Sequence, residues 1–203
     1  IMKRVAQGPG KHLAYLLALC VLASALSSCS FSRKPQTDVA DLLLQNSDVP
    51  EGWTLDWTLS AHTSSSVAND LPLTAVDFAA TSFEKSDLSI SSEASIGHVI
   101  WLFRNERAAS KHYQSTNKNP SLTVPGTLIG LNYESQLADD FLISCKQVQG
   151  EMYACTASGR YGSLTSSISA PIGPETGISR ERFMAMLRQF EDNLQSSRET
   201  AWN

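Results

Sequence analysis

Two cysteines on either side of a predicted turn constrain how the second half of this chain can fold. Residues 139–148 and 151–158 both have strand-like composition, and Gly150 lies between them in a Gln-Gly-Glu loop. If the two strands pair antiparallel across this loop, Cys145 lies directly opposite Cys155. The spacing therefore predicts both the hairpin and its register.

The chemical state of this cysteine pair has three possibilities. Opposed residues in antiparallel strands have Cβ atoms about 4.5–5.5 Å apart and a disulfide needs about 3.5–4.5 Å, so a non-hydrogen-bonded pair can close with a small adjustment. Two free buried thiols are the second possibility. A redox-active pair is the third, but Cys145 and Cys155 lack the Cys-x-x-Cys spacing that lowers a thiol pKa. We predict a Cys145–Cys155 disulfide, which requires an oxidising compartment.

Strand patterns recur along the rest of the chain. Residues 53–60 alternate strictly between apolar and polar side chains. One face of this strand would carry Trp53, Leu55, Trp57 and Leu59. Residues 160–170 extend the cysteine hairpin into a meander, after a predicted turn at Ser158-Gly159. Further candidate strands are 76–83, 88–95 and 97–103.

Helical patterns are fewer. Asn105 can cap a helix at 106–115, and residues 38–45 form a shorter helical pattern. After Ser179, a good N-cap, apolar residues recur with helical spacing at Phe183, Leu187, Phe190 and Leu194. We predict an α+β fold: a mainly antiparallel sheet with helices packed on one face, and a C-terminal amphipathic helix. This single domain would cover residues 38–203.

The N-terminus has the pattern of an export signal. Basic residues within the first 12 positions precede the apolar, uncharged stretch 13–26. As a helix this stretch would span about 21 Å, short of the roughly 30 Å hydrocarbon core of a bilayer. A permanent membrane span is therefore the weaker interpretation, and plain secretory cleavage is another alternative.

The apolar stretch closes with Leu26-Ser27-Ser28-Cys29, which resembles the lipobox of bacterial lipoproteins. The resemblance implies removal of residues 1–28 as a signal peptide, a diacylglyceryl group on Cys29, and acylation of the new amine by a chain such as palmitate. Residues 29–37 would be the lipidated cysteine and a short linker. The mature protein would then lie at the extracytoplasmic face of the cell membrane or outer membrane, with the lipid anchor as its membrane contact.

Composition and charge exclude several classes of function. Across 203 residues the chain is 42% hydrophobic and 18% charged, which fits one globular domain. The net charge is −4, and removal of the signal peptide would take away only basic residues. Clustered Lys and Arg for phosphate binding are missing, so we expect no nucleic-acid partner.

The sequence carries no recognisable catalytic motif. Gly-x-Ser-x-Gly does not occur, and segment 159–162 lacks the Lys-Ser/Thr end of a phosphate loop. His98 and His112 could approach each other, but a structural role is favoured over a metal or acid-base role. The side chains of Asp139 and Asp140 are adjacent and point apart on a strand. A solvated strand edge is therefore favoured over a calcium-binding site. We predict no catalytic residue, no metal and no cofactor.

Two sets of apolar side chains could line a groove instead of a sealed core. Trp53 and Trp57 on the first strand form one set. The set on the C-terminal helix is Phe183, Met186, Leu187 and Phe190. Core packing is favoured for both, and a pocket between the C-terminal helix and the sheet is the preferred ligand site if one exists. The sequence assigns no individual ligand-binding residue.

A second resemblance covers most of the mature chain. It rests on Asp48-Val49-Pro50-Glu51-Gly52-Trp53, on the Cys145 and Cys155 pair followed by Arg160-Tyr161-Gly162, and on the terminal helix. These features resemble uncharacterised bacterial lipoproteins and, more distantly, the extracellular sensor domains of bacterial receptor Ser/Thr kinases. The resemblance implies a disulfide-braced α+β domain that binds ligands.

Two functions from different classes remain. The first is a non-enzymatic binding or envelope-interaction module that recognises a small molecule, a glycan or an envelope protein. The alternative is a hydrolase whose site is assembled only in the fold. A hydrolase should contain a cleft with converging titratable groups, whereas a binder should contain an apolar groove or an exposed patch.

Overall fold

The structure is a computed structural model, and it describes residues 38–60, 75–86, 95–118 and 124–202. The predicted signal peptide, Cys29 and the linker lie outside these residues, as does most of the strand predicted at 88–95. All the described residues belong to one unit, residues 37–203.

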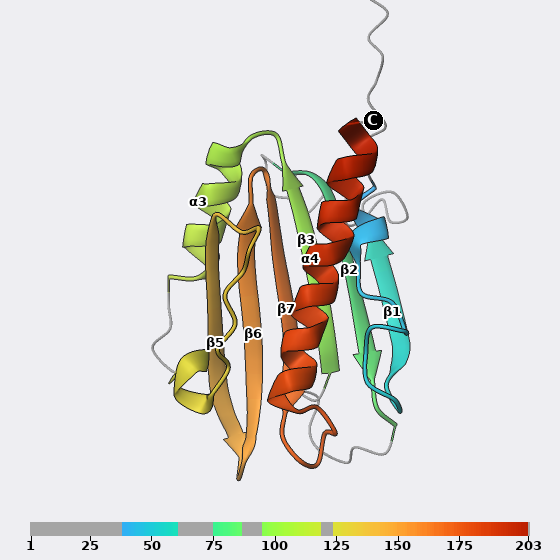
Figure 1. Ribbon diagram of the computed structural model, residues 1–203, viewed down its shortest axis with the longest axis vertical. Coiled ribbons are helices and arrows are strands. Elements are labelled where there is room, and N and C mark those ends of the chain that lie inside the picture. The colour runs from blue at the N-terminus through green and yellow to red at the C-terminus, as the bar shows by residue number, and fades with distance from the viewer. Residues whose placement is uncertain (1–37, 61–74, 87–94, 119–123, 203) are drawn as a thin grey trace, which may run out of the picture. The chain divides into compact units, whose positions relative to one another are not determined.

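Within the described ranges, seven strands form one sheet in which every neighbouring pair is antiparallel (Figure 1). The order across the sheet is β1-β2-β3-β7-β6-β5-β4. The strands are β1 (Thr54–Ser60), β2 (Ala75–Glu84), β3 (Ser95–Phe103), β4 (Val124–Pro125), β5 (Asp140–Gln149), β6 (Met152–Tyr161) and β7 (Leu164–Ile172). The helices are η1 (Val39–Leu42) and η2 (Gly126–Ile129), both 3-10, with the longer α3 (Glu106–Thr116) and α4 (Arg180–Trp202). The predicted α+β class is confirmed.

The cysteine hairpin has the predicted register. Cys145 in β5 is the strand partner of Cys155 in β6, and their sulfur atoms are bonded. Gly150 forms the turn with a φ of 53°, a left-handed conformation that glycine adopts without strain. Both cysteines are buried and belong to the main hydrophobic cluster, so the disulfide is part of the core and is not exposed to solvent.

The predicted turn at Ser158-Gly159 is wrong. β6 continues to Tyr161, and the turn uses Gly162, whose φ is 67°. Gly159 stays within the strand and pairs with Ser166 of β7. A Cβ on Gly159 would lie 2.6 Å from the Tyr161 ring. Gly159 is therefore needed for close packing of this ring, not for a bend.

The predicted single apolar face of residues 53–60 is also wrong. A β-bulge interrupts the pairing of β1 with β2 between Leu55 and Trp57, so the two side chains no longer share a face. Both are nearly half exposed. Trp53 precedes the strand and is buried, and its Nε1–H donates to the Thr176 carbonyl at 3.3 Å. Of the two tryptophans, only Trp53 belongs to the core.

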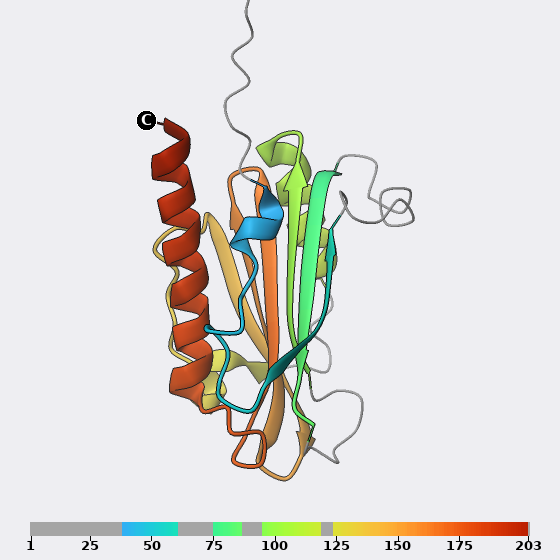
Figure 2. The same cartoon turned by 90° about the vertical axis from the view of Figure 1, so that its right-hand side faces the viewer.

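The two long helices contact opposite faces of the sheet, which corrects the prediction that all helices pack on one face. In β3, the ring of His98 lies 5.0 Å from that of Phe190 in α4, whereas the ring of Trp101 lies 5.7 Å from that of His112 in α3. Residues three positions apart on a strand point to opposite sides. Figure 2 shows α4 and η1 on one side of the sheet and α3 on the other. We call these sides the α4 face and the α3 face.

The main core lies under α4. The apolar stripe of this helix is at most 5% exposed and consists of Phe183, Met186, Leu187, Phe190 and Leu194. It belongs to the same buried cluster as Ile96, Ile100 and Ile168 of the sheet. The stripe is therefore core, as favoured from the sequence, and does not line an open groove.

His98 is the polar residue at the centre of this core, with no exposed surface. The Leu44 backbone N–H donates to its Nδ1 at 3.1 Å, so this nitrogen carries no proton. The proton is then on Nε2, which lies 3.0 Å from Ser166 Oγ and donates to it. Burial lowers the pKa of His98 to about 3. The neutral imidazole thus joins β3 to the segment after η1 and to β7.

Removal of the disulfide should destabilise the domain without changing its fold. Replacing both Cys145 and Cys155 by serine releases a ten-residue loop in the unfolded chain, and loop entropy gives a loss of about 2–3 kcal/mol. Urea unfolding at neutral pH measures this loss. An unchanged midpoint in the double variant would contradict a bracing role for the disulfide.

Acidification should weaken the fold through His98. Between its ordinary pKa of 6.5 and its folded pKa of about 3, the unfolded chain binds a proton that the folded chain excludes. The stabilisation is therefore complete above pH 6.5 and is lost as the pH falls toward 3. We expect the free energy of unfolding to fall less steeply in His98→Asn than in the wild type, by up to about 1.4 kcal/mol per pH unit.

Urea unfolding at a series of pH values tests this expectation. His112→Asn is the matched control, because His112 is only half buried and its pKa is lowered by burial to a lesser degree. Equal pH slopes for the wild type and His98→Asn would show that His98 does not govern acid stability.

Candidate ligand-binding site

The histidines singled out in the sequence do not form a site. His98 points to the α4 face, whereas His112 lies on the α3 face against Trp101 and Phe103. They therefore cannot share a metal or a proton. Among the described residues, no group of three His, Cys, Asp or Glu side chains could hold a metal ion.

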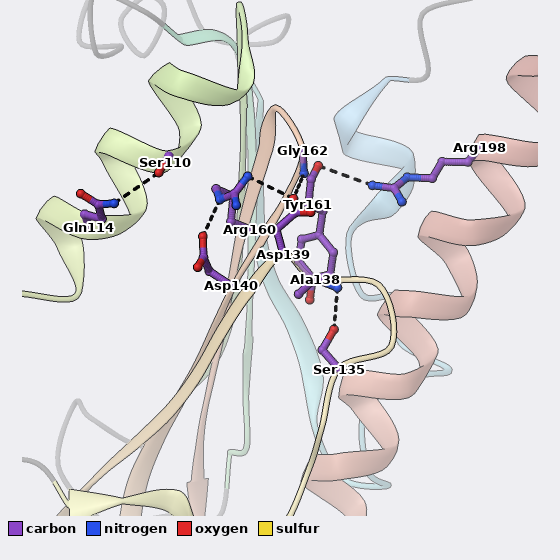
Figure 3. Close-up of polar contacts among 10 residues, drawn as sticks. All are labelled: Ser110, Gln114, Ser135, Ala138, Asp139, Asp140, Arg160, Tyr161, Gly162 and Arg198. Atoms are coloured by element: carbon purple, nitrogen blue, oxygen red, sulfur yellow. Dashed lines mark hydrogen bonds and ion pairs between the residues drawn. The ribbon is translucent and has the colours of Figure 1, made fainter.

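Asp139 and Asp140 both form ion pairs with Arg160 at the end of strands β5 and β6 (Figure 3). Asp139 Oδ2 accepts from the Arg160 guanidinium at 3.1 Å and from the Gly162 backbone N–H at 2.7 Å. Asp140 Oδ2 accepts from Arg160 Nε at 2.6 Å. The two carboxylates are about half exposed, as expected for a solvated edge, but both are paired with one arginine. They fasten the start of β5 to the turn between β6 and β7.

Glu191 is the most densely bonded carboxylate of the described residues, and the sequence analysis did not identify it. The side chain is 7% exposed and accepts from the hydroxyls of Tyr133 at 2.9 Å and Tyr161 at 3.3 Å. It also accepts from Ser135 Oγ and from the Gln136 N–H. Its position four residues after Leu187, on the inward stripe of α4, was the available signal.

This carboxylate holds segments of the fold together. Burial, followed by the bond to Glu191, raises the pKa of Tyr133, and burial and the negative charge of Glu191 raise that of Tyr161. Both phenols therefore remain protonated donors. Four donors bond to this one carboxylate, so Glu191 connects α4 to segment 133–136 and to the end of β6. Its oxygens are occupied and cannot act as a general base.

Cavities lie at both sides of α4 and under α3. One of about 570 Å³ lies at the start of α4 beside Pro174 and Arg180, and one of about 370 Å³ lies next to Glu191. A third, also of about 370 Å³, lies between α3 and the sheet, and we call it the α3 cavity. The location preferred from the sequence, between the C-terminal helix and the sheet, matches the first cavity, which Tyr153 and Ile172 of the sheet line together with Arg180 of α4. The cavity next to Glu191 lies between α4 and segment 132–137.

The α3 cavity is lined mainly by hydroxyl and aromatic side chains. The sheet supplies Val99 and Trp101 from β3, Ser144 from β5, Thr156 and Ser158 from β6, and Thr165 and Ser167 from β7. His112, Tyr113 and Thr116 of α3, with Asn117, form the opposite wall. The hydroxyl residues occur at alternate positions of β6 and β7, so they share one face. The sequence analysis did not select these residues, although this alternation was visible.

Thr165 has an unusual environment in this cavity. The residue is 5% exposed, and its Oγ1 has no hydrogen-bond partner among the described residues. A buried hydroxyl without a partner costs about 1–3 kcal/mol, and most buried polar groups in proteins are therefore paired. Because water cannot reach Oγ1 itself, the hydroxyl lies behind the cavity wall, and it is the other hydroxyl residues of the floor that face the cavity.

The α3 cavity is electrically neutral. Of its described lining residues, none is Asp, Glu, Lys or Arg. Burial lowers the pKa of His112, and burial together with the charge of Asp140 raises the pKa of Tyr113. Both side chains are therefore uncharged near pH 7. The cavity can offer hydrogen bonds and aromatic contact to a ligand, but it provides no charge to pair with an ion.

A serine-histidine contact lies behind the floor of this cavity, on the α4 face, and does not have the properties of a catalytic pair. Ser166, which also borders the cavity, is bonded to His98 Nε2. Because the Leu44 N–H occupies Nδ1, the proton on Nε2 points at the serine. This imidazole therefore has no lone pair with which to accept the serine proton, which is the step that a Ser-His mechanism requires.

Comparisons with known proteins give one structural likeness to report. No family model matches the chain, and no curated protein matches it. The crystal structure of the extracellular domain of PknH from Mycobacterium tuberculosis is similar with a TM-score of 0.49 and 9% sequence identity, over 76% of this chain and 93% of that chain. A likeness of this degree does not extend to function. None of the described helices is long and apolar enough to cross a membrane.

Loss of the Glu191 carboxylate should destabilise the fold. In Glu191→Ala the hydroxyls of Tyr133 and Tyr161 lose their acceptor, at about 1–3 kcal/mol for each buried hydroxyl left unpaired. Glu191→Gln keeps one acceptor oxygen and should lose less. Urea unfolding at pH 7 measures both, with exposed Asp192→Ala on the same helix as the control. A change in Glu191→Ala no larger than in this control would contradict the role of Glu191.

Proposed function

We propose that this chain is a membrane-anchored extracytoplasmic lipoprotein whose folded domain binds a small uncharged ligand in the α3 cavity without transforming it. The observation that supports binding is the neutral α3 cavity itself, whose floor is lined by half-buried hydroxyl residues of three neighbouring strands. The volume of about 370 Å³ falls in the range of roughly 300–1,000 Å³ that is usual for small-molecule sites.

The lipobox sequence supports the anchor half. Residues 30–37 between the lipidated Cys29 and the described domain reach at most about 26–29 Å when extended, so the domain would stay close to the bilayer. A buried Cys145–Cys155 disulfide agrees with an oxidising compartment outside the cytoplasm.

The chemistry of the described residues favours binding over hydrolysis. A hydrolase needs a nucleophile beside a base that can take its proton. The imidazole next to Ser166 is fully buried and bears its proton on the nitrogen facing the serine, and the Glu191 carboxylate is saturated by donors. The α3 cavity contains no carboxylate among its described lining residues.

The anchor is tested by the intact mass of the detergent-extracted protein. We expect a chain that begins at Cys29 and carries acyl chains, and a Cys29→Ser variant that no longer partitions into detergent. An unlipidated wild-type chain would refute the anchor while leaving the binding proposal intact.

Ligand binding is tested by native mass spectrometry of the same preparation. We expect the wild type to release a small neutral molecule on denaturation. Ser167→Phe, which places a ring in the α3 cavity, should carry much less of it. Lys146→Phe is the matched control, because this exposed β5 residue does not line the cavity. Equal amounts in the wild type and Ser167→Phe would contradict the assignment of the cavity.

A further inference from the structure

We propose that the ligand of the α3 cavity is an uncharged carbohydrate of one or two sugar units. This inference rests on the proposed binding function and specifies the chemistry of the same site. It follows from three properties of the cavity: the array of hydroxyl groups on its floor, its neutrality, and the aromatic rings at one end.

The hydroxyl array spans three neighbouring strands. Ser144 of β5 is the partner of Thr156 in β6, and Ser158 of β6 is the partner of Ser167 in β7. Neighbouring strands lie about 4.8 Å apart, and alternate residues along a strand about 6.6–6.8 Å apart. The floor is therefore a two-dimensional grid of groups that can each donate and accept. A sugar presents the same kind of group around a ring, so both partners can be satisfied without charge.

The hydroxyl array distinguishes a sugar from an apolar ligand. An apolar molecule of the same size would exclude water from the floor and leave its half-buried hydroxyls without their water partners. A ligand that carries hydroxyls would instead give these groups new partners. The floor therefore selects a polar ligand, although the cavity has no charge.

Neutrality excludes charged ligands. Arg160 lies beside the cavity end that holds Tyr113, but its guanidinium is already paired with both Asp139 and Asp140 and is not available to an anion in the cavity (Figure 3). An anion or cation in the α3 cavity would lose its hydration and meet no opposite charge among the described lining residues. Uncharged polar molecules therefore remain as candidate ligands. Among them, polyols can form hydrogen bonds with the hydroxyl groups of the floor.

Aromatic rings provide the apolar contact that a sugar also needs. Trp101 and Tyr113 are half buried, so part of each ring faces the cavity, and the C–H groups of a pyranose can pack on such surfaces. The Trp101 ring is held by the rings of Phe78 at 4.3 Å and His112 at 5.7 Å. The aromatic end is thus fixed before a ligand binds.

The test titrates the mature, detergent-solubilised protein with glucose, mannose, galactose, N-acetylglucosamine and maltose. Tryptophan fluorescence and calorimetry report binding. Glucuronate and glucosamine are the charged counterparts, and cyclohexanol is the apolar one. We expect at least one neutral sugar to bind, with the charged and apolar probes binding at least about tenfold more weakly.

Two conservative variants connect binding to the hydroxyl grid. Ser167→Ala removes one hydroxyl from the floor and should weaken sugar binding about tenfold. The free protein should stay nearly as stable as the wild type, because this half-buried hydroxyl makes one long bond, of 3.4 Å, to Ser158 Oγ. Ser169→Ala, on the same strand and face but outside the described cavity lining, should bind as the wild type does. A Ser167→Ala variant that binds sugar normally would overturn the inference.

The remaining outcomes separate this inference from the function on which it rests. Binding of cyclohexanol or a charged sugar in preference to all neutral sugars overturns the carbohydrate and leaves a binding module. The same holds if the molecule released from the native protein is not a sugar. Failure of every sugar to bind at millimolar concentration overturns the carbohydrate, and the absence of any released molecule in addition overturns the binding function.

Discussion

Burial of the apolar stripe of α4 against one face of the sheet is the interaction on which the other features depend. It turns His98, Ile100 and Tyr161 toward the helix and makes that face the core. Because strand side chains alternate, the opposite face receives Trp101, Thr165 and the other hydroxyl residues. The short helix α3 covers part of this second face, and the α3 cavity lies where it does so. The candidate site thus exists because the core is on the other side.

Local patterns in the sequence were sufficient for the parts of the fold that depend on neighbours along the chain. The register of Cys145 and Cys155 follows from one turn, and the helix after Asn105 follows from a capping residue whose side chain accepts from the Ala108 N–H. The bulge in β1, the position of Gly159 and the opposite placement of α3 depend on contacts with distant residues. No local pattern contains this information, so these predictions failed.

The candidate site was hidden for the same physical reason. Glu191 is an ordinary residue in the sequence, and its significance comes from the four donors around its carboxylate. The serines and threonines of the cavity floor are equally ordinary, and they line a cavity because α3 packs above them. His98 and His112, which the sequence suggested could approach each other, lie on opposite faces of the sheet. β3 forms a common wall, with a neutral imidazole on the core side and Trp101 on the cavity side.

The disulfide has a further consequence at the margin of the sheet. Within the described ranges, β4 pairs with β5 at two residues, Val124 and Pro125, so most of β5 has a backbone edge without a strand beside it. An open edge can recruit a strand from another copy of the chain. A covalent bond between β5 and β6 prevents the outer strand from peeling away or slipping in register. Cys145 and Cys155 thus protect this edge from strand exchange and aggregation.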